Sequence, residues 1–127
     1  MEDGTPRLRV LVVDDDWDFL AFIRGAFDRD EPITVEVVGT PLEATWLLER
    51  DRFDVVVSDL HLGSSDGGHL LSMIEERWPR CARVLVTGFA EHVEPSDAHR
   101  AAQAVLIKPV DSVGFRDVLL RLGAKRM

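Results

Sequence analysis

The chain has 127 residues, a single cysteine and a formal net charge of −8 at neutral pH. This length suits one domain with its own hydrophobic core. The acidic balance argues against direct nucleic-acid binding or membrane coating, because both partners are polyanions. Cys81 alone cannot form an intrachain disulfide and fits a reducing cytosol, and the N-terminus lacks the apolar stretch of a signal peptide. We therefore expect a soluble cytoplasmic domain that does not contact a membrane.

The first third of the chain predicts a strand, a helix and a second strand. Residues 8–13 form an apolar run that is typical of a buried strand. Asp16 suits a helix N-cap, because apolar residues recur after it at three- and four-residue spacing as far as Phe27. Residues 33–38, rich in β-branched side chains, predict the next strand.

The middle of the chain repeats this alternation. Thr40 and Pro41 predict the cap and the first residue of a second helix. The apolar run at 54–58 predicts a third strand. A third helix is expected to open around Asp66 and to end before Pro79.

The last third predicts two strands and two helices. Strands are expected at 83–87 and 104–107. Between them, residues 94–102 suggest a short fourth helix whose small alanines offer little apolar surface. Asp111 opens a final helix with an apolar stripe.

The order of elements predicts the fold class. Strand and helix alternate five times, and the strands are nearly continuously apolar, so both faces of the sheet should be covered. We expect an α/β fold with a five-stranded parallel sheet, helices on both faces and right-handed crossovers. Ligands of such sheets bind at the carboxyl ends of the strands, where the strand order reverses.

Polar side chains stand at the ends of four predicted strands. Asp14 and Asp15 follow the first strand, Asp59 the third, Thr87 the fourth and Lys108 the fifth. In a parallel sheet these ends share one edge. Carboxylates gathered this closely repel one another and raise each other's pKa unless a cation joins them. The pattern predicts a hard-cation site whose working ligand is anionic.

At these residues the chain resembles the receiver domains of two-component response regulators over nearly its whole length. Five short motifs in family order carry the resemblance: Val12-Val13-Asp14-Asp15, Ser58-Asp59, Asp66-Gly67, Val86-Thr87-Gly88 and Lys108-Pro109. It implies the strand order 2-1-3-4-5, with the first and third strands beside the reversal point. It also implies one receiver domain over 1–127, structured from about 7 to 124, without an output domain. Such a domain is a signalling module and not an enzyme in the usual sense. The reactions that it catalyses are the phosphorylation and dephosphorylation of its own Asp59.

The resemblance implies a role for each residue of the cluster. Asp59 would accept a phosphoryl group from a phosphohistidine. Asp15 and Asp59 would ligate Mg²⁺, Asp14 would act on the ion through water, and His61 would contribute its backbone carbonyl. These oxygen ligands suit Mg²⁺, which prefers octahedral oxygen coordination and retains several waters.

The resemblance also implies how the phosphoryl group is bound and which partners take part. Thr87 and Lys108 would contact phosphoryl oxygens, in keeping with the need of phosphoryl transfer for positioning and charge neutralisation. The donor would be a sensor histidine kinase or a phosphotransfer protein. The output would pass to a downstream protein or an attached output domain, and the chain would be a monomer or a weak dimer.

Two departures from the family pattern concern how the signal is transmitted. Val105 stands where an aromatic side chain usually reports phosphorylation, and Gly63 stands where a proline is common. Phosphorylation would alter the face formed by the fourth helix, fifth strand and fifth helix. With Val105 too small to act as the reporter, we expect coupling through Gly88, Phe89 and Ala90.

Other interpretations remain open. Taken singly, Asp16 caps a helix, Asp59 ends a strand in solvent, and Lys108 lies in a loop. A pseudo-receiver that binds proteins without being phosphorylated would share the fold. A haloacid-dehalogenase-like phosphatase would use Asp14 as its nucleophile, but Asp18 stands where such enzymes carry Thr or Val. A flavin phosphate would be repelled by the acidic cluster.

Overall fold

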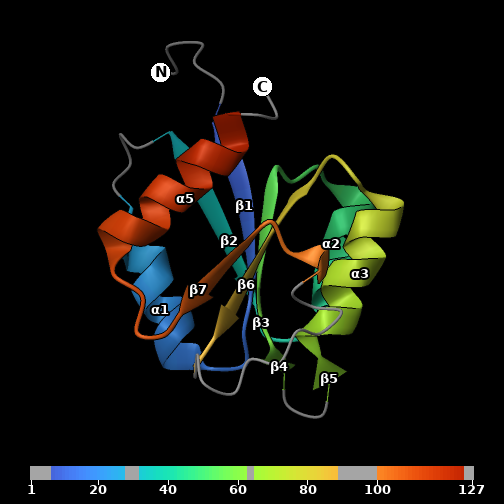
Figure 1. Cartoon of the computed structure of the whole chain (residues 1–127), viewed down its shortest axis with the longest axis horizontal. Helices are drawn as coiled ribbons and strands as arrows, with labels where there is room; N and C mark the ends of the chain where they lie inside the picture. Colours follow the sequence, from blue (N-terminus) through green and yellow to red (C-terminus); the bar gives the residue numbers. More distant parts are fainter. Residues whose placement is uncertain (1–6, 28–31, 63–64, 89–99, 125–127) are drawn as a thin grey trace.

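The structure is a computed structural model that describes residues 7–27, 32–62, 65–88 and 100–124. A parallel sheet of five strands forms its centre (Figure 1). These strands are β1 (Leu8–Val13), β2 (Ile33–Val38), β3 (Val55–Asp59), β6 (Ala82–Thr87) and β7 (Ala104–Ile107). Their order is β2-β1-β3-β6-β7, which is 2-1-3-4-5 when only the strands of this sheet are counted. The predicted fold class is confirmed.

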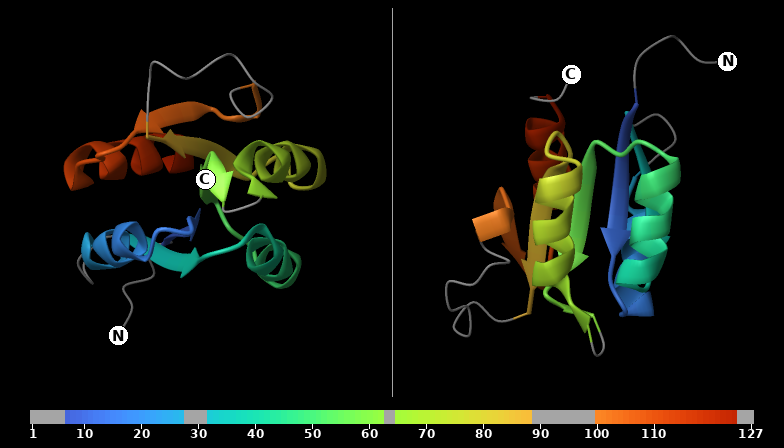
Figure 2. Two further views of the ribbon diagram at one scale, coloured as in Figure 1. Left: turned by 90° about the horizontal axis from the view of Figure 1, so that it is seen from below. Right: turned by 90° about the vertical axis from the view of Figure 1, so that its right-hand side faces the viewer.

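Among the described residues, two helices cover each face of the sheet. Figure 2 shows α1 (Trp17–Gly25) and α5 (Ser112–Ala124) on one face, and α2 (Pro41–Arg50) and α3 (Gly67–Arg77) on the other. The predicted caps are present. The Asp16 carboxylate accepts hydrogen bonds from the first turn of α1, and the Thr40 hydroxyl accepts one from Glu43 N at the start of α2.

The core has one layer on each side of the sheet, because side chains alternate along each strand. Every side chain of β3 except Asp59, and every side chain of β6, is buried. The layer under α1 and α5 is built around Val10, Val57, Leu20, Phe115 and Leu119. The layer under α2 and α3 is built around Leu11, Val56, Leu48, Leu71 and Leu85. Burial on both faces explains why the strands read as continuous apolar runs.

The structure differs from the sequence-based predictions in small ways. A two-stranded antiparallel hairpin, β4 (His61–Leu62) with β5 (Ser65–Asp66), follows β3 at the carboxyl end of the sheet (Figure 1). The predicted fourth helix lies mostly outside the described residues. Of its predicted range, Arg100 and Ala101 are described and have helical backbone. Gly63, Phe89 and Ala90 also lie outside the described residues. None of the described helices has the length and apolar content to cross a bilayer.

Candidate functional site

The structure brings together the three carboxylates that end β1 and β3. Carboxylate oxygens of Asp14, Asp15 and Asp59 all lie within 4.8 Å of one another. β1 and β3 are hydrogen-bonded neighbours in register, so their carboxyl ends meet at one edge of the sheet. The three side chains differ in access: Asp14 is fully buried, Asp59 is partly buried and Asp15 is exposed.

Lys108 supplies the one cationic side chain that pairs with this cluster among the described residues. Its Nζ lies 2.8 Å from Asp14 Oδ2 and 3.5 Å from Asp59 Oδ2. It also lies 4.5 Å from the centre of the Phe19 ring, a cation–π contact that helps to hold the long side chain over the sheet edge. The peptide bond between Lys108 and Pro109 is cis. The Lys108 side chain, at the end of β7, reaches across β6 to the carboxylates of β1 and β3.

The pKa of Asp14 and that of Lys108 are both raised from their ordinary values. Burial raises the pKa of the Asp14 carboxyl, an effect strengthened by the charge of Asp59 and only partly offset by the close Lys108 ammonium and the hydrogen bond from the Asp16 N–H. Burial alone would lower the pKa of Lys108, but its close pairing with Asp14 and the charge of Asp59 outweigh this and raise it. The raised pKa of Lys108 keeps its ammonium charged, and among the described residues this one ammonium faces three carboxyl groups.

The oxygens of the cluster leave room for a further cation. Asp14 Oδ1 accepts a hydrogen bond of 2.9 Å from the Asp16 backbone N–H. Asp14 Oδ2 is completely buried, and its polar neighbour is the Lys108 ammonium, which approaches at 2.8 Å with poor hydrogen-bond geometry. Such an oxygen-rich donor set, with one buried oxygen incompletely satisfied, fits a hard divalent cation.

His61 and Thr87 border the cluster from two further elements. The backbone N–H of His61 donates to Asp59 Oδ1 at 3.3 Å, and the His61 side chain is exposed. Thr87 ends β6, is 4% exposed, and its carbonyl accepts a hydrogen bond of 2.8 Å from Lys108 N. The roles predicted for the His61 carbonyl and the Thr87 hydroxyl stay predictions.

Gly67 holds the β4–β5 hairpin against the end of β3. A Cβ atom at Gly67 would overlap with the Asp59 carbonyl oxygen and would come within 2.9 Å of the Ser58 hydroxyl. The same hydroxyl donates to the Asp59 carbonyl, and Gly67 N donates to the Leu60 carbonyl. The sequence singled out Gly67 only as part of a motif. Its steric role depends on a close approach of backbone that no local pattern reveals.

Comparisons with known proteins agree with this fold. The model of the response regulator receiver domain family matches residues 10–119. The chain belongs to this family, whose members are signalling domains of two-component systems.

Two related proteins and one solved structure illustrate this similarity. The alginate biosynthesis transcriptional regulatory protein AlgB of Pseudomonas putida is 32% identical over 102 residues, which cover 80% of this chain and 22% of AlgB. The chain thus spans about a fifth of that relative's length. An uncharacterized 14.6 kDa protein of Leptolyngbya boryana is 32% identical over 108 residues, 83% of this chain and 82% of that protein. The crystal structure of a CheY-like receiver domain protein from Methanospirillum hungatei JF-1 superposes with a TM-score of 0.84 at 22% identity, covering 94% of this chain and 96% of that one.

Replacing Gly67 by Ala is expected to destabilise the protein. The new methyl group must displace the Asp59 carbonyl, and such overpacking costs about 1–3 kcal/mol. Urea unfolding measures the loss. Gly25→Ala is the matched control, because a Cβ at this position of α1 meets nothing within 4 Å. Its free energy of unfolding should rise by about 0.5–1 kcal/mol, since alanine favours the helix over glycine. Equal stability of the two variants would refute the close-approach argument.

Replacing Asp14 by Asn is expected to stabilise the metal-free protein near neutral pH. The pKa of folded Asp14 lies above its ordinary value of 3.8, so the folded chain holds a proton that the unfolded chain has released. The free energy of unfolding therefore falls as pH rises from 3.8 through the folded pKa, and Asn avoids this loss. Urea unfolding in EDTA should show a larger advantage for Asp14→Asn at about pH 7 than at about pH 4. An advantage that does not change with pH would contradict this origin.

Proposed function

We propose that the chain is a phosphorylation-dependent signalling receiver in which Asp59 accepts the phosphoryl group. The carrying observation is the placement of the Asp59 carboxylate, which ends β3 at the point where strand order reverses. Its side chain is 13% exposed and lies 3.5 Å from the Lys108 ammonium. This carboxylate is both reachable from solvent and next to a cation, and membership of the receiver family supports the same assignment.

The geometry disfavours Asp14 as the nucleophile of a phosphatase. The Asp14 side chain is 1% exposed and is paired with Lys108 at 2.8 Å. In-line attack on phosphorus needs a carboxylate oxygen that the donor can approach, which a buried and paired group does not offer. The pseudo-receiver alternative is disfavoured by the complete set of three clustered carboxylates and a lysine.

The proposed transfer is a displacement at phosphorus. One Asp59 carboxylate oxygen forms the new P–O bond, the P–N bond of the donor phosphohistidine breaks, and the leaving imidazole takes up a proton. Lys108 pairs with one phosphoryl oxygen, and the Thr87 hydroxyl donates to another after transfer. Both residues stabilise the roughly one to two negative charges that the phosphoryl group adds.

We further propose that Mg²⁺ supports this transfer. Asp15 and Asp59 would hold it, helped by Asp14 and the His61 backbone carbonyl. When bound, the ion supplies positive charge that balances the phosphoryl oxygens. The excess negative charge of the cluster and the incompletely satisfied Asp14 Oδ2 support this assignment.

The proposed partners follow from this chemistry. The donor is the phosphohistidine of a sensor histidine kinase or a phosphotransfer protein. The output is a downstream protein or an attached domain. The related regulators support this, because they are much longer than the part that this chain matches. The 127 residues would act as one receiver domain in the cytoplasm, as a monomer or a weak dimer.

Transmission of the signal is proposed to run through the segment between Thr87 and Ala101. Val105 on the edge strand β7 is 39% exposed and pairs in register with Leu85, two residues before Thr87. The far end of the segment is fixed, because the buried Arg83 Nε donates to the Ala101 carbonyl at 2.6 Å. Gln103 adds two hydrogen bonds to the Arg83 backbone, at 2.8 and 2.9 Å. A change at Thr87 would therefore move residues 88–100 against a fixed point at 101–103.

Incubation with acetyl phosphate and Mg²⁺ tests the acceptor. Intact-mass spectrometry should show one added phosphoryl group that base treatment removes, because an acyl phosphate is labile. Asp59→Asn should abolish the adduct. Asp111→Asn, at an exposed carboxylate that caps α5, is the control and should keep it. Persistence of the adduct in Asp59→Asn would sink the assignment.

Unphosphorylated wild-type protein with Mg²⁺ tests the switch. Beryllofluoride, a mimic of the acyl phosphate, should shift backbone amide signals within 88–102 more than those around Val105. Largest shifts centred on Val105 would overturn the proposed route.

A further inference from the structure

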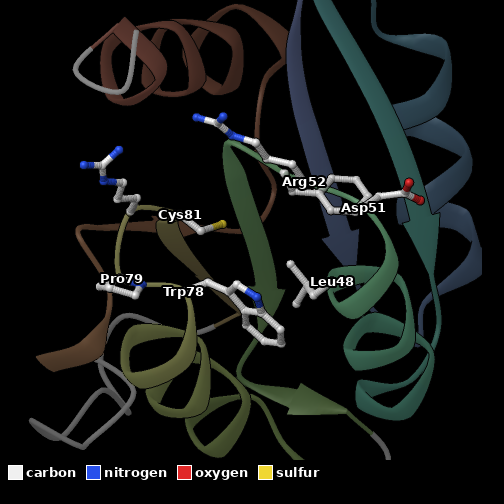
Figure 3. A pocket seen from close by; sticks show the side chains of 8 residues that line it. Leu48, Asp51, Arg52, Trp78, Pro79 and Cys81 are labelled. Carbon is white, nitrogen blue, oxygen red and sulfur yellow. The ribbon is translucent and has the colours of Figure 1, made fainter.

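A cavity of about 430 Å³ lies at the amino end of the sheet, opposite the carboxylate cluster (Figure 3). It is bordered by residues 51–53, which lead from α2 into β3, and by residues 78–81, which lead from α3 into β6. Its volume lies within the range of about 300–1,000 Å³ that is usual for small-molecule sites. None of its lining residues takes part in the proposed phosphorylation site.

The floor of this cavity is apolar and belongs to the core. Leu48, Phe53 and Cys81 line it and are almost fully buried. In Figure 3 the Trp78 indole and the Leu48 side chain lie next to each other, and Cys81 lines the same cavity. An apolar ligand body placed there would cover hydrophobic surface and contact an aromatic ring.

The rim of the cavity is cationic, although the chain as a whole carries a charge of −8. Arg52 and Arg80 line it and are exposed, and neither makes an ion pair with a described carboxylate. Arg77 nearby differs, because it is paired with Glu49 at 3.2 Å. Asp51 also lines the cavity, and in Figure 3 both its carboxylate and the Arg52 guanidinium point away from the Trp78 indole. Because neither arginine is held by an ion pair with a described residue, both exposed side chains can turn toward an anion at the rim.

The walls of the cavity are held in place without a ligand. The buried guanidinium of Arg83 donates to the Cys81 carbonyl at 2.7 Å and to the Pro79 carbonyl at 3.5 Å. The last turns of α2 and α3 are closed by hydrogen bonds from Asp51 N to Leu47 O and from Trp78 N to Ile74 O. The carboxyl ends of α2 and α3 border the cavity, so their helix dipoles oppose an anion there and the two arginines must supply the opposite charge. A preformed site loses less conformational freedom on binding.

We propose that this cavity binds a small organic anion, a carboxylate with a flat apolar body. The body lies against Trp78 and Leu48 over the apolar floor, and the carboxylate lies at the rim, where Arg52 and Arg80 turn to pair with it. Arginine suits this role because its planar guanidinium matches carboxylate geometry and stacks on rings. Charge complementarity sets the ligand class, since a cation of the same shape would face two guanidinium groups.

The test uses 2-naphthoate and its neutral analogue 2-naphthylmethanol with the whole chain. Titration followed by ¹H–¹⁵N spectra should show saturable shifts of the Trp78 indole N–H and of amides in 51–54 and 78–82. The neutral alcohol should bind at least about tenfold more weakly, because it lacks the charge that the two arginines pair with.

Variants assign that difference to the rim. The double variant Arg52→Gln with Arg80→Gln should weaken 2-naphthoate binding at least about tenfold and bring its affinity close to that of the alcohol. Arg121→Gln, at an exposed arginine of α5, is the matched control and should leave the affinity unchanged. A thermal melt shows that the variants fold. Absence of saturable shifts, equal affinity for acid and alcohol, or unchanged binding by the double variant would each overturn the proposal.

Discussion

The site depends on one electrostatic constraint: three carboxylates meet at the ends of two adjacent parallel strands with a single ammonium to balance them. The pairing of β1 with β3 forces Asp14 and Asp59 together, and Asp15 follows Asp14 directly. Lys108 reaches the two more buried carboxylates and leaves a negative excess. That excess disfavours the cluster without a further cation, and in the proposed function a divalent cation and an incoming phosphoryl group would share one charge balance.

The scaffold makes this arrangement rigid. β3 and β6 are buried on both faces, so the ends that carry Asp59 and Thr87 are fixed by two layers of core. Gly67 lets the β4–β5 hairpin pack directly on the Asp59 backbone. At the opposite end of β6, Arg83 fixes residues 101–103 and the walls of the arginine-rimmed cavity. One central strand therefore connects the proposed phosphoryl site to the only buried arginine among the described residues.

Much of the fold was predictable from sequence because local and tertiary signals agree. The strands were located to within a residue, since burial on both faces leaves continuous apolar runs such as Val10 to Val13. Asp16 and Thr40 marked helix starts because their side chains accept the hydrogen bonds of the first turn. The β4–β5 hairpin was missed because strands of two residues carry no periodicity.

The strand-end residues of the candidate site were predictable, but their contacts were not. Strand ends and the family resemblance pointed to Asp14, Asp15, Asp59, Thr87 and Lys108. The contact of Lys108 with the Phe19 ring and the overlap that a side chain at Gly67 would cause depend on residues distant in sequence. The cavity is built likewise from two loops that meet only in the fold.

The most direct test of the central claim is the effect of Mg²⁺ on thermal unfolding. If the three carboxylates share a cation, millimolar Mg²⁺ should raise the melting temperature of the wild-type chain, because the ion binds only the folded state. Asp15→Asn should lose most of that shift, whereas Asp16→Asn, which keeps the helix cap, should retain it. A full shift in Asp15→Asn, or none in the wild type, would contradict a metal-balanced carboxylate site.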